Sequence, residues 1–403
     1  MSRTRRVAMM INLEWPMVHH HQVFAGIQRY ARQCGHWECS VNPYAELLLP
    51  KAGRKGGCGW DGIVARVTPK LAELARKAHV PVVNVWLNTP ARGLPSVVHD
   101  ARESGRMAAR HLLERGFRTF GYLGRSSDLG SRLQLAGFRS ALKDVGCECS
   151  EMWVGRNYAR TAENWREFQQ QLGTWMDSWT LPIGVFAAHD LLARYLAELC
   201  RQRRLEIPYS VALVGSFNEA VVAVHSDPAI SSVDFGFERI GYRAAALLDE
   251  MMDGAAPPEK PICLAPAELV ARQSTNAFSV TEPMVAGALK FISANSHQDI
   301  DVVAVADHVI TTRRTLARLF QKTLGRTVHE MITRIRLDRV KHELVELNTP
   351  IKTIARNCGF GDAIHLCKVF QRVEGISPSE YRAARTTHDL SLRPGQGHGS
   401  KMS

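Results

Sequence analysis

A row of arginines near the C-terminus carries the side chains best suited to recognising another molecule. Residues 312–325 have apolar side chains at helical spacing, which are Leu316, Leu319, Phe320 and Leu324. If these point inward, the outward face consists of Arg313, Arg314, Ala317, Arg318 and Gln321. The planar fork of an arginine matches O6 and N7 of guanine, and each such pair contributes about 1–3 kcal/mol of discrimination. The pattern predicts a helix with one buried face and one arginine-rich face that can bind another molecule.

A second stretch, residues 349–382, predicts two short helices joined by a glycine turn. Thr349 is expected to cap the first helix, and Gly359 to end it in the left-handed conformation. Asp362 is expected to cap the second helix, which Gly375 closes. Two helices joined in this way form a helix-turn-helix, whose second helix lies in the major groove. Residues 301–325 predict a similar pair, with caps at Asp301 and Thr312 and a stop at Gly325.

The pattern G-F-x₅-L-x₃-F-x₄-G-x-S-P-x-x-Y-R, from Gly359 to Arg382, resembles the signature of the AraC/XylS family of transcription regulators. The chain departs from the family at His365-Leu366, where an aromatic pair is usual. The resemblance implies an all-α DNA-binding domain with two helix-turn-helix motifs over residues 284–385. It assigns base contacts to Arg314, Ala317 and Arg318 in the first motif. The matching outward positions of the second motif are Ala363, Ile364, Cys367 and Lys368.

The second set is mostly apolar and suits thymine methyl groups, so we expect the first motif to carry more sequence specificity. Phosphate contacts, which position the protein without reading sequence, are expected from a further set. These residues are Thr312, Arg313, Lys322, Arg326, Lys352 and Arg372.

The charge balance agrees with a polyanionic partner. The chain of 403 residues has a formal net charge of +12, and from Pro283 onward 18 Lys and Arg stand against 11 Asp and Glu. Nine scattered cysteines predict free thiols, and Cys147-x-Cys149 does not have the spacing of zinc ligands. No apolar run approaches the ~18 residues that a membrane span needs, and the basic N-terminus lacks the pattern of a signal sequence. We expect a cytoplasmic protein.

Before residue 276 the sequence alternates between strand-like and helix-like segments, starting with a buried strand at Val7–Ile11. Alternation of this kind predicts βαβ units and a mostly parallel sheet. The strands are too many for one small sheet, and the pattern restarts near Arg118. We therefore expect two α/β lobes that bind a ligand between them, near the carboxyl ends of their strands.

Several phrases in this region together resemble the core of LacI-type regulators, which is similar to periplasmic sugar-binding proteins. They are Asp61–Val64, His99-Asp100, Gly116–Arg118, Ser131-Arg132 with Gly137-Phe138, Phe186–Asp190 and Val214–Asn218. The resemblance covers residues 6–275. It implies a first lobe of about residues 6–116 and 236–258, and a second of about 117–235 and 259–275. Residues 276–283 read as a linker and 386–403 as a disordered tail.

The LacI resemblance also implies where a ligand binds. Asp190 and Asn218 follow predicted strands and match the sugar-contacting positions of this fold, and Arg132 matches its ligand-binding arginine. Further candidates also stand at predicted strand ends, where an aromatic ring can stack on a sugar. They are Asp234, Glu14, Trp15, Arg66 and Trp86.

His19-His20-His21 raises the question of a metal site. Consecutive side chains point in different directions, so a solvated helix start is the better interpretation, and no metal or other cofactor is expected. The chain contains no G-x-S-x-G, H-E-x-x-H or Walker loop. We expect no enzyme activity.

A LacI-like sensor joined to an AraC-type reader implies a sugar-responsive transcription regulator. The resemblance points to an activator of pentose catabolism genes, with D-xylose as the first candidate effector, operator DNA and RNA polymerase as partners, and a homodimer as the working form. Another sugar, or repression instead of activation, remains an alternative. A sugar-binding receptor without a DNA role is a more remote one.

Overall fold

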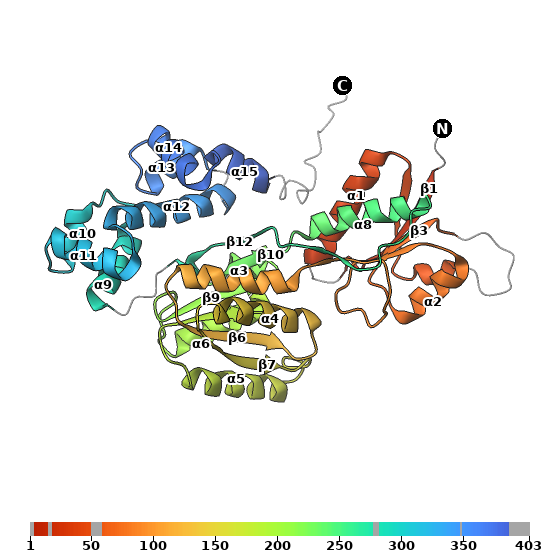
Figure 1. Ribbon diagram of the computed structural model, residues 1–403, viewed down its shortest axis with the longest axis horizontal. Helices are drawn as coiled ribbons and strands as arrows, with labels where there is room; N and C mark the ends of the chain where they lie inside the picture. Colours follow the sequence, from red (N-terminus) through yellow and green to blue (C-terminus); the bar gives the residue numbers. More distant parts are fainter. Residues whose placement is uncertain (1–3, 15–17, 50–58, 277–281, 347–348, 387–403) are drawn as a thin grey trace, which may run out of the picture. The chain divides into compact units, whose positions relative to one another are not determined.

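The computed structural model describes residues 4–14, 18–49, 59–276, 282–346 and 349–386. The predicted linker lies mostly outside these ranges, as do nearly all of the predicted tail and Trp15. The chain divides into two compact units, Met1–Thr275 and Asn276–Ser403 (Figure 1). No helix within the described ranges is long and apolar enough to span a membrane. The eight cysteines in these ranges are all free.

The first unit contains two lobes, each built on a mostly parallel sheet. The first sheet has the order β2-β1-β3-β4, with all neighbours parallel. Its strands are β1 (Arg5–Met10), β2 (Trp37–Val41), β3 (Gly62–Ala65) and β4 (Val82–Asn84). A bridge between Asn84 and Ser96 leads to β5 (Val97–His99), which pairs with β11 (Ile262–Leu264). The helices of this lobe are η1 (Ala45–Leu48), α1 (Val18–Cys34), α2 (Pro69–Ala78) and α8 (Phe237–Met252).

The second sheet has the order β12-β10-β9-β8-β6-β7, and only its β12–β10 pair is antiparallel. Its strands are β6 (Thr119–Arg125), β7 (Cys149–Val154), β8 (Ile183–Ala187), β9 (Val211–Ser216), β10 (Ser231–Asp234) and β12 (Glu268–Val270). Its helices are α3 (Ala101–Glu114), α4 (Leu129–Lys143), α5 (Ala162–Asp177), α6 (Asp190–Gln202), α7 (Ala220–Ala223) and η2 (Gln273–Thr275).

The lobe boundaries differ from those expected. Helix α3 belongs to the second lobe, because its Ala108 and Leu112 lie in one buried cluster with Phe120. Strand β11, expected in the second lobe, pairs with β5 of the first. The chain therefore passes between the lobes three times, after β5, after β10 and between β11 and β12. The first passage occurs near Asp100, whose side chain caps α3, and not near residue 116.

Figure 1 shows α1 beside α8 in the first lobe and α3 beside α4 in the second. Glycines set the close packing of both pairs. In α4, a Cβ on Gly137 would lie 1.8 Å from the carbonyl oxygen of Arg102 in α3. In α8, a Cβ on Gly241 would lie 2.0 Å from the carbonyl oxygen of Val23 in α1. Since real Cβ atoms do not approach so closely, the backbones of these helices meet at a distance that only glycine permits.

The second unit is wholly helical within its described residues. Its helices are α9 (Pro283–Asn295), α10 (Val302–His308), α11 (Arg313–Leu324), α12 (Val328–Glu346), α13 (Ile351–Asn357), α14 (Ala363–Glu374) and α15 (Pro378–Thr386). Helix α12 contributes Ile332 to the buried cluster around α10 and α11, and Val340 to the cluster around α13 and α14. It therefore joins two helix-turn-helix units, as predicted.

Most of the predicted helix ends are confirmed. The side chains of Asp301, Thr312 and Asp362 accept hydrogen bonds from the first turns of α10, α11 and α14. Gly325, Gly359 and Gly375 adopt positive φ values of 65°, 74° and 79°. The prediction for Thr349 is wrong. Pro350 stays extended with ψ 141° and takes the cap position itself, so the helix begins one residue later.

Candidate functional site

The predicted reading face of α11 is exposed to solvent. Arg313, Arg314, Ala317 and Arg318 are all exposed, whereas Leu316 and Phe320 on the opposite face are fully buried. The Thr312 hydroxyl accepts from the backbone N–H of Thr315 at 3.2 Å, so it fixes the N-terminus of the helix. Three guanidinium groups therefore project from one rigid helix that its cap and its buried face hold in place.

Helix α14 presents a different surface. Ile364 is 69% exposed and Lys368 is exposed, while Ala363 and Cys367 are only partly so. Leu366, Val369 and Phe370 are buried as predicted. His365 is exposed and lies edge-on to the ring of Phe360, with 5.7 Å between the ring centroids. The second helix thus offers fewer hydrogen-bonding groups than the first.

The candidate phosphate contacts are also at the surface. All are exposed: Thr312, Arg313, Lys322, Arg326, Lys352 and Arg372. Their assignment to phosphates, and that of the neighbouring residues to base edges, stays a prediction.

In the sensor unit, Asp190 is buried at the start of α6, and both of its carboxylate oxygens have protein partners. Oδ1 accepts from the hydroxyl of Ser232 at 2.6 Å, and Oδ2 accepts from the backbone N–H of Glu219 at 2.8 Å. Burial raises the pKa of Asp190 to about 7, although these hydrogen bonds oppose the shift. Asp190 therefore holds the segment after β9 in place through the backbone of Glu219.

That segment contains Asn218, whose side chain is held at both ends. Its Nδ2 donates to Asp234 at 3.1 Å, and its Oδ1 accepts from Arg272 at 2.8 Å. Asp234 also accepts from the backbone N–H of Gly236 at 2.7 Å. The structure thus brings Asp190, Asn218 and Asp234 together in one region of the second lobe. Their contact with a ligand remains a prediction.

The other predicted ligand residues are more dispersed. Arg132 is exposed and donates to the carbonyl of Ser126 at 2.8 Å, and Glu14 is exposed beyond β1. Arg66 and Trp86 do meet, with the guanidinium 4.6 Å from the centre of the indole ring. An arginine held over an aromatic face at the ends of β3 and β4 is a suitable platform for a small ligand.

Histidines and phenylalanines form a cluster that no sequence pattern predicted, and its rings are those of His19, His99, His189, Phe217, Phe235 and Phe237. The prediction of a solvated histidine triplet is wrong, because His20 is only 3% exposed and its Nδ1 lies 2.8 Å from the carbonyl oxygen of Asn12. His19 packs beside it and against Phe217 and Phe237. The available signals were a histidine directly before Asp190 and a phenylalanine directly after β9.

Burial keeps three of these histidines neutral. It lowers the pKa of His19 to about 3, and the pKa of His99 and His189 to about 4. Neighbouring histidines and Arg66 add to the effect on His19, whereas Asp128 opposes it at His99 and His189.

These shifts predict that acid destabilises the sensor. In the unfolded chain the three histidines take up protons below their ordinary pKa of 6.5, while in the folded protein they remain neutral down to about pH 4. The unfolded state then binds more protons, so the free energy of unfolding decreases as pH falls. Asp190 works in the opposite direction between about pH 7 and pH 4, because its folded form is protonated first. The three histidines together change the free energy of unfolding more than Asp190 does, so the net effect of acid is a loss of stability.

We therefore expect the melting temperature of the sensor unit to fall by about 5 °C or more between pH 6.5 and pH 4.5. Scanning calorimetry on the full chain measures this change. A His189→Phe variant should show a shallower dependence on pH. A melting temperature that rises across this range would contradict the prediction.

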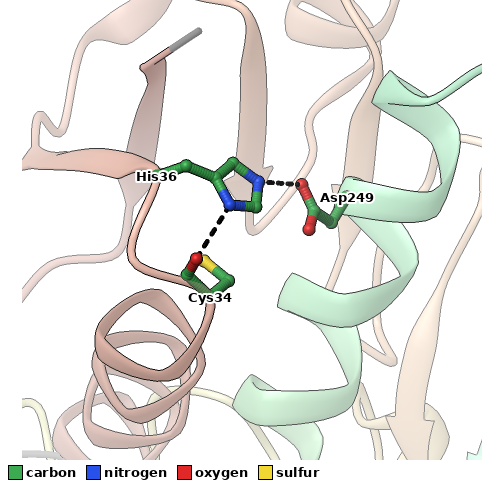
Figure 2. Close-up of side chains that lie close together, drawn as sticks. All are labelled: Cys34, His36 and Asp249. Carbon is green, nitrogen blue, oxygen red and sulfur yellow. Dashed lines mark hydrogen bonds and ion pairs between the residues drawn. The ribbon is translucent and has the colours of Figure 1, made fainter. Parts of the chain in front are cut away.

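Cys34, His36 and Asp249 bring a sulfur, a nitrogen and an oxygen within 4.8 Å of one another. Figure 2 shows the three side chains, with His36 between the other two. Asp249 nevertheless accepts hydrogen bonds from Arg5 at 2.6 Å, Tyr30 at 2.7 Å and Trp37 at 2.9 Å. Although burial opposes the charged form, these bonds hold the pKa of Asp249 below its usual value.

The guanidinium group of Arg5 donates to Oδ1 of Asp249, the oxygen that also faces His36, and its positive charge repels a metal cation there. The Nδ1 of His36 also lies 3.0 Å from the carbonyl oxygen of Cys34, and the Cys34 thiol donates to the carbonyl of Ala31. We therefore interpret the cluster as a structural link that ties β1, α1 and β2 to α8.

Comparison with known proteins supports both parts of the chain. A model for periplasmic binding protein-like domains matches residues 109–275, and a model for helix-turn-helix domains matches residues 305–384. The xylose operon regulatory protein of Haemophilus influenzae is 27% identical over 384 residues, which are 94% of this chain and 98% of that protein. The protein of the same name in Escherichia coli is 26% identical, with 94% and 97% covered.

Solved structures show the same fold. A xylose-binding transcription activator superposes with a TM-score of 0.64 and 23% identity, covering 95% of this chain and 99% of its own. The regulator CelR in complex with cellobiose covers 68% of this chain and 85% of its own, with a TM-score of 0.52 and 23% identity. A putative AraC-like regulator of Streptomyces antibioticus is 33% identical over 103 residues, which are 26% of this chain and 34% of that protein.

These proteins are regulators and not enzymes, and three of them match both parts of the chain over nearly their full length. Together with the exposed arginine face of α11, the matches indicate a DNA-binding transcription regulator, in which a LacI-like, periplasmic-binding-protein-like domain precedes an AraC-type helix-turn-helix domain, and which is similar over nearly its whole length to xylose operon regulatory proteins.

Proposed function

We propose that the protein is a sugar-responsive activator of pentose catabolism genes, with D-xylose as its effector. The observation that carries this proposal is the match of the whole chain, sensor and reader in the same order, to two xylose operon regulatory proteins. The sugar binds between the two lobes, near the strand ends that carry Asp190, Asn218, Asp234, Arg66 and Trp86. The protein works in the cytoplasm, where its DNA is.

Sugar binding favours the arrangement of the lobes that gives it more contacts, and it shifts the equilibrium only by that difference in affinity. Rotation of the lobes about the connecting segments changes the geometry of a homodimer and hence the spacing of its DNA readers. The readers then occupy paired half-sites beside RNA polymerase. In this scheme Arg314 and Arg318 read base edges, while Lys322, Arg326 and Lys352 hold phosphates.

The experiment is a thermal shift screen of the purified full chain against pentoses and hexoses, followed by binding to its own promoter fragment with and without the active sugar. We expect D-xylose to raise the melting temperature and to change DNA affinity. A response to a different sugar would support a sugar-responsive regulator and would show that its effector is not D-xylose. Sugar binding without any retention of promoter DNA at low salt would support a receptor instead.

A further inference from the structure

Phe217 connects the two lobes through a stack of aromatic rings. It follows β9 of the second sheet, yet its side chain packs against the hydrophobic cluster of the first lobe. Its ring is parallel to that of His189 within 5°, with 4.6 Å between centroids. On the first lobe, His19 lies 5.7 Å from the Phe217 ring and 5.2 Å from the Phe237 ring. A histidine from each lobe therefore lies against the same stack.

Each of these two histidines has a buried ring nitrogen without a hydrogen bond. Among the described residues, nothing pairs with Nδ1 of His19 or with Nε2 of His189. The neighbouring His20, by contrast, is paired with the Asn12 carbonyl. A buried polar atom that lacks a partner costs about 1–3 kcal/mol. Two such atoms on facing lobes indicate a site that is completed by another molecule.

The backbone beside the stack is strained. Phe217 has a φ of 90°, a value that bulky residues rarely adopt, and Asn218 follows it in the left-handed region with a φ of 49°. Asp190 holds the N–H of Glu219, while Asp234 and Arg272 hold the side chain of Asn218. Strain that the surroundings maintain in this way is typical of ligand-binding segments. It adds a second, independent indication of a site here.

The chemistry of the unpaired nitrogens selects the ligand class. A neutral imidazole offers one donor and one acceptor, which complement a hydroxyl group, itself both donor and acceptor. Nε2 of His189 lies 4.0 Å from Oδ2 of Asp128, too far for a direct bond. Oδ2 of Asp128 already accepts from the backbone N–H and the hydroxyl of Ser131 at 2.8 and 2.7 Å, so Nε2 of His189 is the group of this pair that lacks a partner. Asn88 from the first lobe donates to the other oxygen of Asp128 at 2.6 Å, so it keeps the carboxylate in place.

The same surroundings oppose other ligands. The imidazoles are neutral, and the charges near them are of both signs, because Asp128 and Arg125 act on His189 and Arg66 acts on His19, so the pair does not select a charged ligand. His19 and His189 do not form a group of three metal-ligating atoms with any neighbour in the described ranges. A neutral molecule with several hydroxyl groups remains.

We propose that His19 and His189 recognise hydroxyl groups of the effector, a neutral sugar or polyol, from opposite lobes. This inference rests on the proposed sugar-sensing function and adds to it two specificity-determining residues. Because one histidine belongs to each lobe, the effector links the lobes through the pair. Loss of either nitrogen therefore weakens binding and not folding.

The test uses the full chain with His19→Phe and His189→Phe, which keep an aromatic ring in the stack and remove the nitrogens. Titration calorimetry with D-xylose, or with the sugar that the panel identifies, should show at least about tenfold weaker binding for each variant. The melting temperature without sugar should be unchanged or higher, because an unpaired buried nitrogen has been removed. His225→Phe, at an exposed position of the second lobe, is the matched control.

If the phenylalanine variants do not fold, His19→Gln and His189→Gln provide the same comparison with polar groups retained, and each is expected to bind several-fold more weakly than the unaltered protein. Unaltered sugar affinity in folded variants at both positions would overturn the inference and leave the proposed function intact. If the unaltered protein binds none of the pentoses or hexoses, the proposed function and the inference both fail.

Discussion

Replacing Arg314 or Arg318 with alanine should lower the affinity for operator DNA by about tenfold or more, and should relax specificity at the bases that each arginine reads. Both side chains are exposed on α11, whose opposite face is anchored by Leu316 and Phe320. The loss therefore comes from base contacts and not from unfolding. Fluorescence anisotropy with the natural operator and with single-base variants measures both effects.

Two comparison variants separate base reading from general attraction to DNA. Lys322→Ala should weaken binding to every sequence alike and reduce the slope of log affinity against log salt by about one. Lys368→Ala on α14 should have a smaller effect than either arginine variant. Equal weakening of all operator variants by Arg314→Ala and Arg318→Ala would show that these arginines contact phosphates.

Replacing Gly137 with alanine is expected to cause the largest loss of stability. The added Cβ would lie 1.8 Å from the backbone oxygen of Arg102, an atom that cannot move without shifting α3. The two helices must separate, which uncovers part of the cluster around Leu112 and Phe138. We expect the free energy of unfolding to decrease by about 3 kcal/mol or more.

Gly155→Ala is the matched control, because a Cβ at this exposed position meets no atom within 4 Å and the backbone has no positive φ. Denaturant unfolding of the full chain, followed by the fluorescence of the second-lobe tryptophans, measures both variants. An alanine at position 137 that matches the control would mean that α3 and α4 adjust without cost.

Most features of the fold that depend on a short stretch of sequence were predicted correctly. Caps such as Asp362 and left-handed glycines such as Gly375 depend on a few neighbouring residues, and the alternation of strands and helices depends on apolar spacing. Both helix-turn-helix units and the two-lobed sensor were accordingly predictable. The error at Thr349 arose because Thr349 and Pro350 both suit a helix start, and sequence alone does not rank them.

Contacts between distant segments were not predictable in the same way. The assignment of α3 to the second lobe depends on its packing against α4, which no periodicity reveals. The stack of His19, His189 and Phe217 joins residues that are far apart in the chain. Asp190 was predicted as a ligand contact because it follows a strand and matches a sugar-contacting position of the LacI-type fold, and its two oxygens accept from Ser232 and Glu219. The hydrogen bonds of Asp190 could not be predicted, because Ser232 and Glu219 lie far from it in the sequence.

The three passages of the chain between the lobes determine which parts of this protein can be exchanged by recombination. Neither lobe is encoded by one continuous stretch, so exchanging a lobe between relatives requires three simultaneous junctions. The reader follows the sensor as one uninterrupted segment, and a single recombination event after Thr275 can replace it. One junction therefore exchanges the whole sensor or the whole reader in a single step, whereas the exchange of one lobe needs three junctions at once.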